Sequence, residues 1–194
     1  MLRTFIIACR TALFTLLLTG VAYPLLVTGL AQLLFPGKAG GSLVKDERGQ
    51  VVGSELIGQR FSHPAYFHAR PSAAGDKTYD PTASGGSNYG VTSQKLRDRV
   101  ISDLESLKKQ NPQGAALVPA ELLTASASGL DPHLSPAGVR WQVPRVAAAR
   151  KVAPERIEAV IQDYIQDRDL AFLGEPRVNL LLLNLALDRQ FGRP

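Results

Sequence analysis

Apolar residues dominate the first forty positions of the chain, and the remainder alternates between short apolar runs and polar segments. Between Thr11 and Phe35 there is no charged side chain, and about 25 helical residues at about 1.5 Å each extend roughly 37 Å. This length exceeds the ~30 Å hydrocarbon core of a bilayer. The pattern therefore predicts a transmembrane helix over residues 11–35, with a short tail before it (residues 1–10) and a glycine-rich linker after it (residues 36–42).

Charged residues flanking this segment predict its orientation. Arg3, Arg10 and the free amine precede it, whereas the first acidic residue of the chain is Asp46. Because basic residues beside a span favour the cytoplasmic side, we expect a cytoplasmic N-terminus, a single pass through the inner (plasma) membrane, and residues 43–194 outside the cytoplasm. A cleaved signal peptide is the alternative. Its apolar region is usually only ~7 to 15 residues long, so we expect the segment to be retained.

Small and hydroxyl side chains recur on one face of the predicted helix. Thr11, Thr15 and Thr19 are four residues apart, and Tyr23 and Pro24 continue the series. Such a face allows a second helix to approach closely, although threonine also commonly bonds to the backbone of its own helix. We expect a packing face for a membrane partner, and a kink at Pro24 because proline removes one backbone donor.

Residues 43–194 have the pattern of a mostly helical soluble domain with a small β element. Two short apolar runs around a polar turn predict a hairpin over Ser42–Gly53. Periodic apolar positions predict four helices. The first begins near Thr92 or Ser93 and ends at Gln110, and the second runs from Ser135–Pro136 to Ala149 with an interruption at Pro144. The third runs from Pro154 to Asp169, and the fourth from Val178 to Phe191. The fold class is therefore α+β.

Two segments have no clear period. Residues 54–91 are rich in Gly, Ser, Pro, His and Tyr, and a loop of this length is usually functional or disordered. Its five Phe and Tyr side chains favour order. Residues 121–126 fit either a short helical turn or a strand.

Composition excludes several classes of function. Lys and Arg total 22 against 17 for Asp and Glu, and the two signs are interspersed, which does not indicate a nucleic-acid partner. Cys9 is the only cysteine, so the soluble domain has no cysteine for a disulfide or a zinc site. His63, His68 and His133 lack the spacing of a zinc site, and no Gly-x-Ser-x-Gly motif is present. We expect no metal and no catalytic residue; an anchored hydrolase is the less favoured alternative.

One loop could bind an anion. Ser84, Gly85, Gly86, Ser87 and Asn88 precede a predicted helix, where free backbone N–H groups favour phosphate. The loop lacks the Lys-Ser/Thr ending of a Walker A motif, and a tight turn that requires positive φ is the alternative.

Three further polar residues are candidates for an interface or a structural contact. Arg70, before Pro71, could pair with a carboxylate or a phosphate, and a structural pair within the long loop is the favoured interpretation. Asp131 and His133 lie in a predicted turn around Pro132.

Several strings resemble, in chain order, the C subunit of Kdp-type potassium-transporting ATPases. They are Tyr23-Pro24 in the anchor, Ile57-Gly58-Gln59, Tyr66-Phe67 followed by Arg70-Pro71-Ser72-Ala73, Ala83 to Asn88, Thr124 to Pro136, Arg145-Val146-Ala147, and Pro176 to Asp188. His68 and Tyr89 depart from the pattern that we expect in this family. The resemblance covers nearly the whole chain.

The resemblance implies a non-catalytic accessory subunit of a high-affinity, ATP-driven potassium import complex. Its partners would be a channel-like potassium-translocating subunit, a P-type ATPase catalytic subunit and a small single-helix subunit. The family is regarded as a catalytic chaperone that raises the ATP affinity of the pump subunit, with residues 84–88 likened to the signature loop of ATP-binding cassettes. No cofactor would be tightly bound, and ATP would act through the pump subunit.

The predicted topology conflicts with direct contact between this loop and ATP. If Arg3 and Arg10 are cytoplasmic, residues 84–88 face a compartment that holds little ATP. The alternative is an extracytoplasmic domain that caps the potassium entrance without touching nucleotide.

Overall fold

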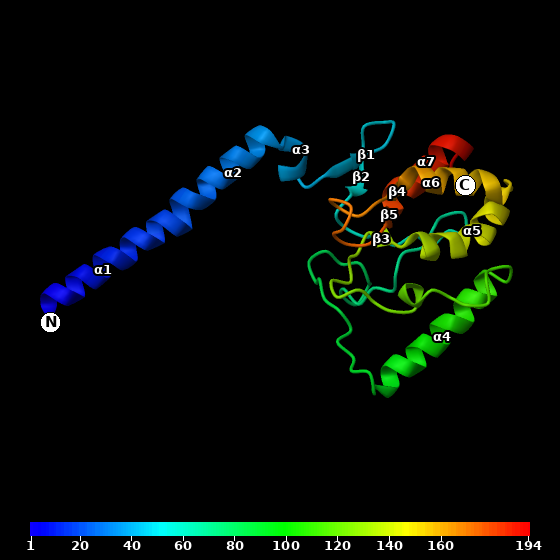
Figure 1. Cartoon of the computed structure of the whole chain (residues 1–194), viewed down its shortest axis with the longest axis horizontal. Helices are drawn as coiled ribbons and strands as arrows, with labels where there is room; N and C mark the ends of the chain where they lie inside the picture. The colour runs from blue at the N-terminus through cyan, green and yellow to red at the C-terminus, as the bar shows by residue number, and fades with distance from the viewer. The chain divides into compact units, whose positions relative to one another are not determined.

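The computed structural model describes residues 1–194, which form an N-terminal unit, Met1–Leu43, and a globular unit, Val44–Pro194 (Figure 1). The N-terminal unit is one helix over Leu2–Leu34, followed by the short helix α3 (Pro36–Ala39). Most side chains of the long helix are apolar, and none of its residues is buried. By length and composition it is able to cross a membrane. It begins nine residues before the predicted span, and α3 occupies part of the predicted linker.

Pro24 is accommodated by a change of helix type. The long helix consists of α1 (Leu2–Leu17), a π-helical turn (Leu18–Ala22) and α2 (Tyr23–Leu34). In this turn the backbone N–H of Tyr23 donates to the carbonyl of Leu18. A π-helical turn is one of the recognised ways in which a helix adjusts next to a proline. The disturbance expected at Pro24 therefore lies in the turn before it.

The globular unit contains two small antiparallel sheets and four helices, which confirms the α+β class. A hairpin, β1 (Leu43–Lys45) and β2 (Val51–Ser54), forms the first sheet as predicted, and the second has the order β3-β5-β4. The strands of this second sheet are β3 (His133–Leu134), β4 (Ile165–Gln166) and β5 (Arg177–Asn179). The helical elements of the globular unit are α4 (Gln94–Gln110), the 3₁₀ turn η2 (Ala120–Leu122), α5 (Pro136–Arg150), α6 (Pro154–Tyr164) and α7 (Leu180–Phe191).

Strand pairing corrects two of the predicted helix boundaries. Helix α6 ends at Tyr164, because Ile165 turns into extended geometry and pairs with Val178. Helix α7 begins at Leu180 and not at Val178, because residues 177–179 form the central strand of the sheet. The side chain of Asn179 accepts a hydrogen bond from the N–H of Leu182, as an N-cap does.

Two further predictions concern the N-terminal cap of α4 and the continuity of α5 at Pro144. Ser93 caps α4, as one of the two predicted caps, with its hydroxyl 3.4 Å from the N–H of Leu96. The interruption predicted at Pro144 is wrong, since α5 runs through it. Trp141, Val143 and Val146, on either side of the proline, are buried in the core and hold both halves of α5 in place.

The core lies among α5, α6 and α7 and includes one side chain from the long irregular segment. Val139, Ile157, Ile161 and Leu183 are fully buried there, and Phe67 joins them from the segment before α4. Each such side chain contributes about 1.5–3 kcal/mol through removal of apolar surface from water. Phe67 therefore fixes the middle of the irregular segment on the core.

Residues 55–92 contain no helix or strand, and helix side chains bind their buried backbone. Asn184 of α7 accepts from the N–H of Phe67 at 2.9 Å and donates to its carbonyl at 3.0 Å. Gln142 of α5 does the same for His68, at 2.9 and 3.0 Å. Both amides are almost fully buried. They take the place of the strand that would otherwise satisfy these buried peptide groups.

Replacement of Asn184 tests this account. Asn184→Ala leaves the N–H and carbonyl of Phe67 buried without partners, so we expect the free energy of unfolding to fall by about 2–3 kcal/mol. Urea unfolding of the full chain in detergent, followed by the fluorescence of the buried Trp141, measures the change. The matched control is Gln190→Ala, at an exposed position of the same helix, where a change within ~0.5 kcal/mol is expected. Equal stability of the two variants would contradict the account.

Candidate functional site

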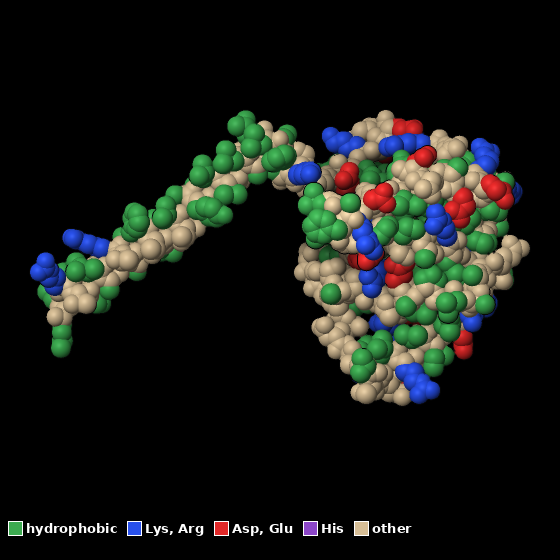
Figure 2. Space-filling model, in the orientation of Figure 1, with side chains coloured by type: hydrophobic (Ala, Val, Ile, Leu, Met, Phe, Trp, Pro, Cys, Tyr) green, Lys and Arg blue, Asp and Glu red, His purple; other side chains and the backbone are tan.

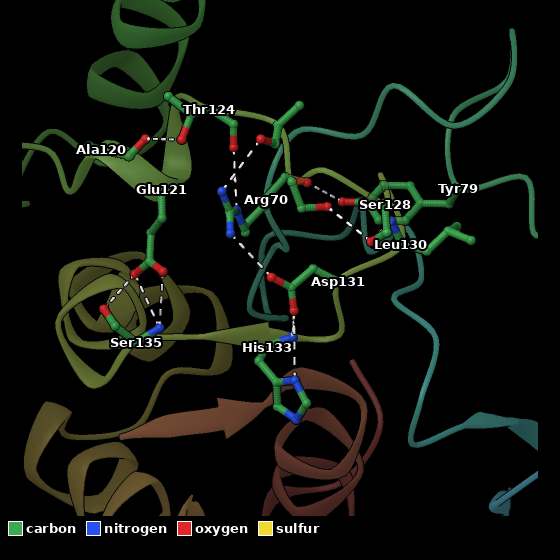
Figure 3. Close-up of polar contacts among 12 residues, drawn as sticks. Arg70, Tyr79, Ala120, Glu121, Thr124, Ser128, Leu130, Asp131, His133 and Ser135 are labelled. Atoms are coloured by element: carbon green, nitrogen blue, oxygen red, sulfur yellow. Dashed lines mark hydrogen bonds and ion pairs between the residues drawn. The ribbon is translucent and has the colours of Figure 1, made fainter. Parts of the chain in front are cut away.

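Arg70 joins three segments of the globular unit. Its Nη1 lies 3.2 Å from Oδ2 of Asp131, in the turn before β3 (Figure 3). Its other nitrogens donate to the carbonyls of Thr124 and Ala125, at 3.4 and 3.5 Å. The Arg70 and Asp131 side chains are 25% and 29% exposed, so water screens this pair only partly. Arg70 thereby links the irregular segment to residues 124–131.

Asp131 is also bound to His133, the third predicted residue of this group. Its Oδ1 accepts a hydrogen bond from the backbone N–H of His133 at 3.0 Å and lies 3.7 Å from the imidazole Nδ1 (Figure 3). Burial alone would raise the pKa of Asp131. The hydrogen bonds from His133 and the charge of Arg70 outweigh burial and hold this pKa below its ordinary value. The structure thus brings Arg70, Asp131 and His133 together, with a carboxylate in the middle.

The Ser84 to Asn88 loop is bound to the neighbouring segment of the same domain. The N–H of Gly85 donates to the carbonyl of Ser128 at 2.8 Å, and the hydroxyl of Ser84 donates to the same carbonyl at 3.0 Å. A Cβ on Gly86 would lie 3.1 Å from the carbonyl oxygen of Ala127. This glycine therefore allows one backbone to lie directly against another.

Two sequence-based expectations about this loop need correction. The loop does not run straight into a helix, because α4 begins at Gln94, six residues after Asn88. Positive φ occurs at Asn88, with φ of 50°, and at neither Gly85 nor Gly86. Asparagine tolerates this conformation better than most residues. The glycines are required for close approach, and the turn geometry falls on the asparagine.

Two threonine hydroxyls of the predicted membrane face bond to their own helix. Thr15 donates to the carbonyl of Thr11 at 2.9 Å, and Thr19 donates to that of Thr15 at 2.7 Å. Tyr23 is 64% exposed. Short side chains at positions 11, 15 and 19, two of whose hydroxyls bond within the helix, suit close contact with another helix in lipid.

The histidines do not converge. Across residues 1–194, no three histidine, cysteine or acidic side chains lie together as metal ligands would. The Nε2 of His68 lies 3.2 Å from the backbone carbonyl of His63, whereas His133 belongs to the Asp131 group.

A second polar group, around Arg145 of α5, was absent from the predicted site residues. Arg145 donates to the carbonyls of Pro64 and Tyr66 and, at 2.7 Å, to the side chain of Gln142. Burial lowers its pKa to about 10, so that it remains charged at neutral pH. The signal available in the sequence was the position of Arg145 between the apolar residues Val143 and Val146. Both valines are buried in the structure, and a cation beside them requires buried acceptors.

Comparison with known proteins decides the family. The family model described as "K+-transporting ATPase, c chain" matches residues 5–189. The chain belongs to this family. The "Potassium-transporting ATPase KdpC subunit" of Myxococcus xanthus is 62% identical over 192 residues, which cover 99% of this chain and 90% of the relative. The proteins of the same name from Rhodospirillum rubrum and Herpetosiphon aurantiacus are 54% and 48% identical, over 90% of both chains and 97% of both chains, respectively.

Membership of the C-chain family confirms the resemblance seen in the sequence strings. The match contains most of the anchor helix and all the residues of the Arg70 and Arg145 groups. The chain is accordingly a subunit of a potassium-transporting ATPase, with one helix that is able to serve as a membrane anchor.

The pKa of His68 predicts a stability change at mildly acidic pH. Burial, followed by the charge of Arg145, lowers this pKa from 6.5 to about 4. Between pH 6.5 and 4 the unfolded chain therefore binds a proton that the folded chain does not, and folding stability decreases as the pH falls through this window. We expect the urea concentration at the midpoint of unfolding, monitored by Trp141 fluorescence, to decrease as the pH is lowered from 6.5 to 4.5.

Two variants separate His68 from other groups that titrate. His68→Gln removes the titrating ring and should flatten the pH dependence in this window. His63→Gln, at an exposed position five residues earlier, should retain it. A slope that is the same in His68→Gln and in the natural chain would contradict the assignment.

Proposed function

We propose that this C-chain protein is a non-catalytic, membrane-anchored accessory subunit whose globular unit lies outside the cytoplasm and caps the potassium entrance of the channel-like subunit. The main support is the Ser84 to Asn88 loop. Two of its donors, the N–H of Gly85 and the hydroxyl of Ser84, are bonded to the carbonyl of Ser128. A phosphate would have to displace both bonds to use these donors.

The N-terminal helix supports the anchored topology. Apolar side chains cover it, and its basic side chains lie towards the N-terminal end (Figure 2). Arg3 and Arg10 are these residues, and no charged residue follows them up to the end of the helix at Leu34. Because basic residues favour the cytoplasmic side, the globular unit is assigned to the opposite side.

The three partners proposed are the channel-like potassium-translocating subunit, the P-type catalytic subunit and the small single-helix subunit. The short side chains of Thr11, Thr15 and Thr19 offer a surface for close packing of a partner helix in lipid. The globular unit would act by favouring one conformation of the complex. A change in the pump's ATP affinity would then be a coupled effect that does not require this subunit to hold nucleotide.

Labelling from outside the cell tests the topology. In a Cys9→Ser background, Val91→Cys places a thiol at a position that is 98% exposed in the globular unit. We expect a membrane-impermeant thiol reagent to label it in cells stripped of their outer barrier. A second variant with a cysteine in the tail, Thr4→Cys, should be labelled only after lysis. The reverse pattern would overturn the topology and restore direct contact with nucleotide.

Truncation tests the capping role. A chain that ends at residue 43 retains the anchor and lacks the globular unit. In the purified complex we expect weaker potassium affinity and slower potassium-dependent ATP hydrolysis. The full-length Ser84→Ala variant is the control, and it should leave the KM for ATP unchanged because its hydroxyl bonds only within the domain. Unchanged assembly, potassium affinity and turnover in the truncated complex would overturn the role, and a raised KM for ATP in Ser84→Ala would favour nucleotide binding.

A further inference from the structure

The connection between β4 and β5 exposes a continuous group of apolar side chains. Leu170, Phe172 and Leu173 are 78%, 69% and 49% exposed, and Ala171 between them is also exposed. The backbone of Leu170 and Ala171 is left-handed, with φ of 53° and 67°. This conformation is unfavourable for residues other than glycine, asparagine and aspartate. The chain thus adopts a strained turn that leaves its apolar side chains in solvent.

This apolar tip, residues 170–173, is held at the end of a stable base. Asp169 and Leu173 exchange two backbone hydrogen bonds, each 2.9 Å long. Arg168 pairs with Glu175 at 2.6 Å, and Arg177 pairs with Asp169 at 3.2 Å. Two backbone hydrogen bonds close the base of the tip, and the largely exposed ion pairs add little to them.

We propose that the apolar tip enters the interfacial layer of the bilayer that holds the chain's own anchor helix. The inference rests on the anchoring that is part of the proposed function. Phe35–Leu43, the nine residues between α2 and the globular unit, reach at most about 30 Å when extended, and α3 shortens this reach. The first strand of the globular unit is therefore tethered close to the membrane surface.

The tip belongs to the part of the globular unit that carries this tether. The side chain of Asn179, in β5, donates to the carbonyl of Glu55 at 2.8 Å, and Glu55 directly follows β2. The residue after β2 is thus bonded to the last residue of β5, the strand that follows the β4–β5 connection (Figure 1). Leu56 and Ile57, next to Glu55, are exposed as well.

Lipid suits this tip better than a protein surface does. A stable protein interface covers about 800 Å² on each partner, far more than a turn of four residues offers. The bilayer interface accepts exposed Phe and Leu side chains without a complementary shape. The nearby charges of Arg168 and Arg177 are already paired within the base, so attraction to anionic lipid is not the driving force.

Spin labels in nanodiscs test the proposal. The full chain, in a Cys9→Ser background and in neutral phosphatidylcholine nanodiscs, carries a nitroxide at Phe172→Cys or, in a second variant, at Leu170→Cys. The solvent control is Val91→Cys, 98% exposed, and the lipid control is Leu26→Cys in the anchor helix. We expect collisions with a water-soluble nickel complex to be several-fold rarer at residues 170 and 172 than at residue 91. High salt and added anionic lipid should leave this difference unchanged.

Each contrary outcome has a distinct meaning. If residues 170 and 172 are as accessible to nickel as residue 91 while residue 26 is protected, the tip remains in water and this inference is overturned, with the anchor intact. If the tip is protected only in the assembled potassium-transporting complex, a protein partner covers it and the lipid assignment is wrong. If residue 26 is itself open to nickel, the anchor fails, and the inference fails with it.

Discussion

The globular unit depends on a single constraint, which is that buried backbone without regular structure needs hydrogen-bond partners. Residues 55–92 form neither helix nor strand, yet Phe67 in their midst is fully buried. The side chains of Asn184 and Gln142 satisfy the N–H and carbonyl groups of Phe67 and His68, and Arg145 donates to the carbonyls of Pro64 and Tyr66. Helices α5 and α7 therefore act as a frame on which an irregular segment is fixed.

The candidate site is a consequence of this frame. Once Phe67 is fixed, Arg70 reaches Asp131, and the segment beyond it packs against residues 126–129. The hydroxyl of Ser72 donates to the carbonyl of Gly129 at 2.6 Å, and Gly85 bonds to Ser128. The glycine-rich loop is thus one of several contacts that close the same interface within the domain. This arrangement favours a rigid docking domain over a nucleotide cradle.

In the proposed function, the N-terminal helix lies in lipid and the globular unit lies in water. The helix over Leu2–Leu34 has no buried residue and requires lipid or a partner helix to cover it. The globular unit buries its own core, and residues 170–173 form a run of exposed apolar side chains on its surface. Anchor and tip would then attach one domain to one bilayer at two points.

The sequence by itself determined the features that depend on local pattern: the long apolar helix, the β1–β2 hairpin, the start of α4 after Thr92 or Ser93, the α+β class and the family. It did not determine where α6 ends or where α7 begins, because Ile165 and Val178 pair across a sheet that forms only in the folded chain. Nor did it identify Gln142, Asn184 and Arg145 as the residues that hold the irregular segment. A polar side chain on a helix shows no sign in the sequence of which distant peptide group it will meet, since that depends on how the helices pack. The tertiary structure alone decided these contacts, and with them the pairing of Arg70 with Asp131.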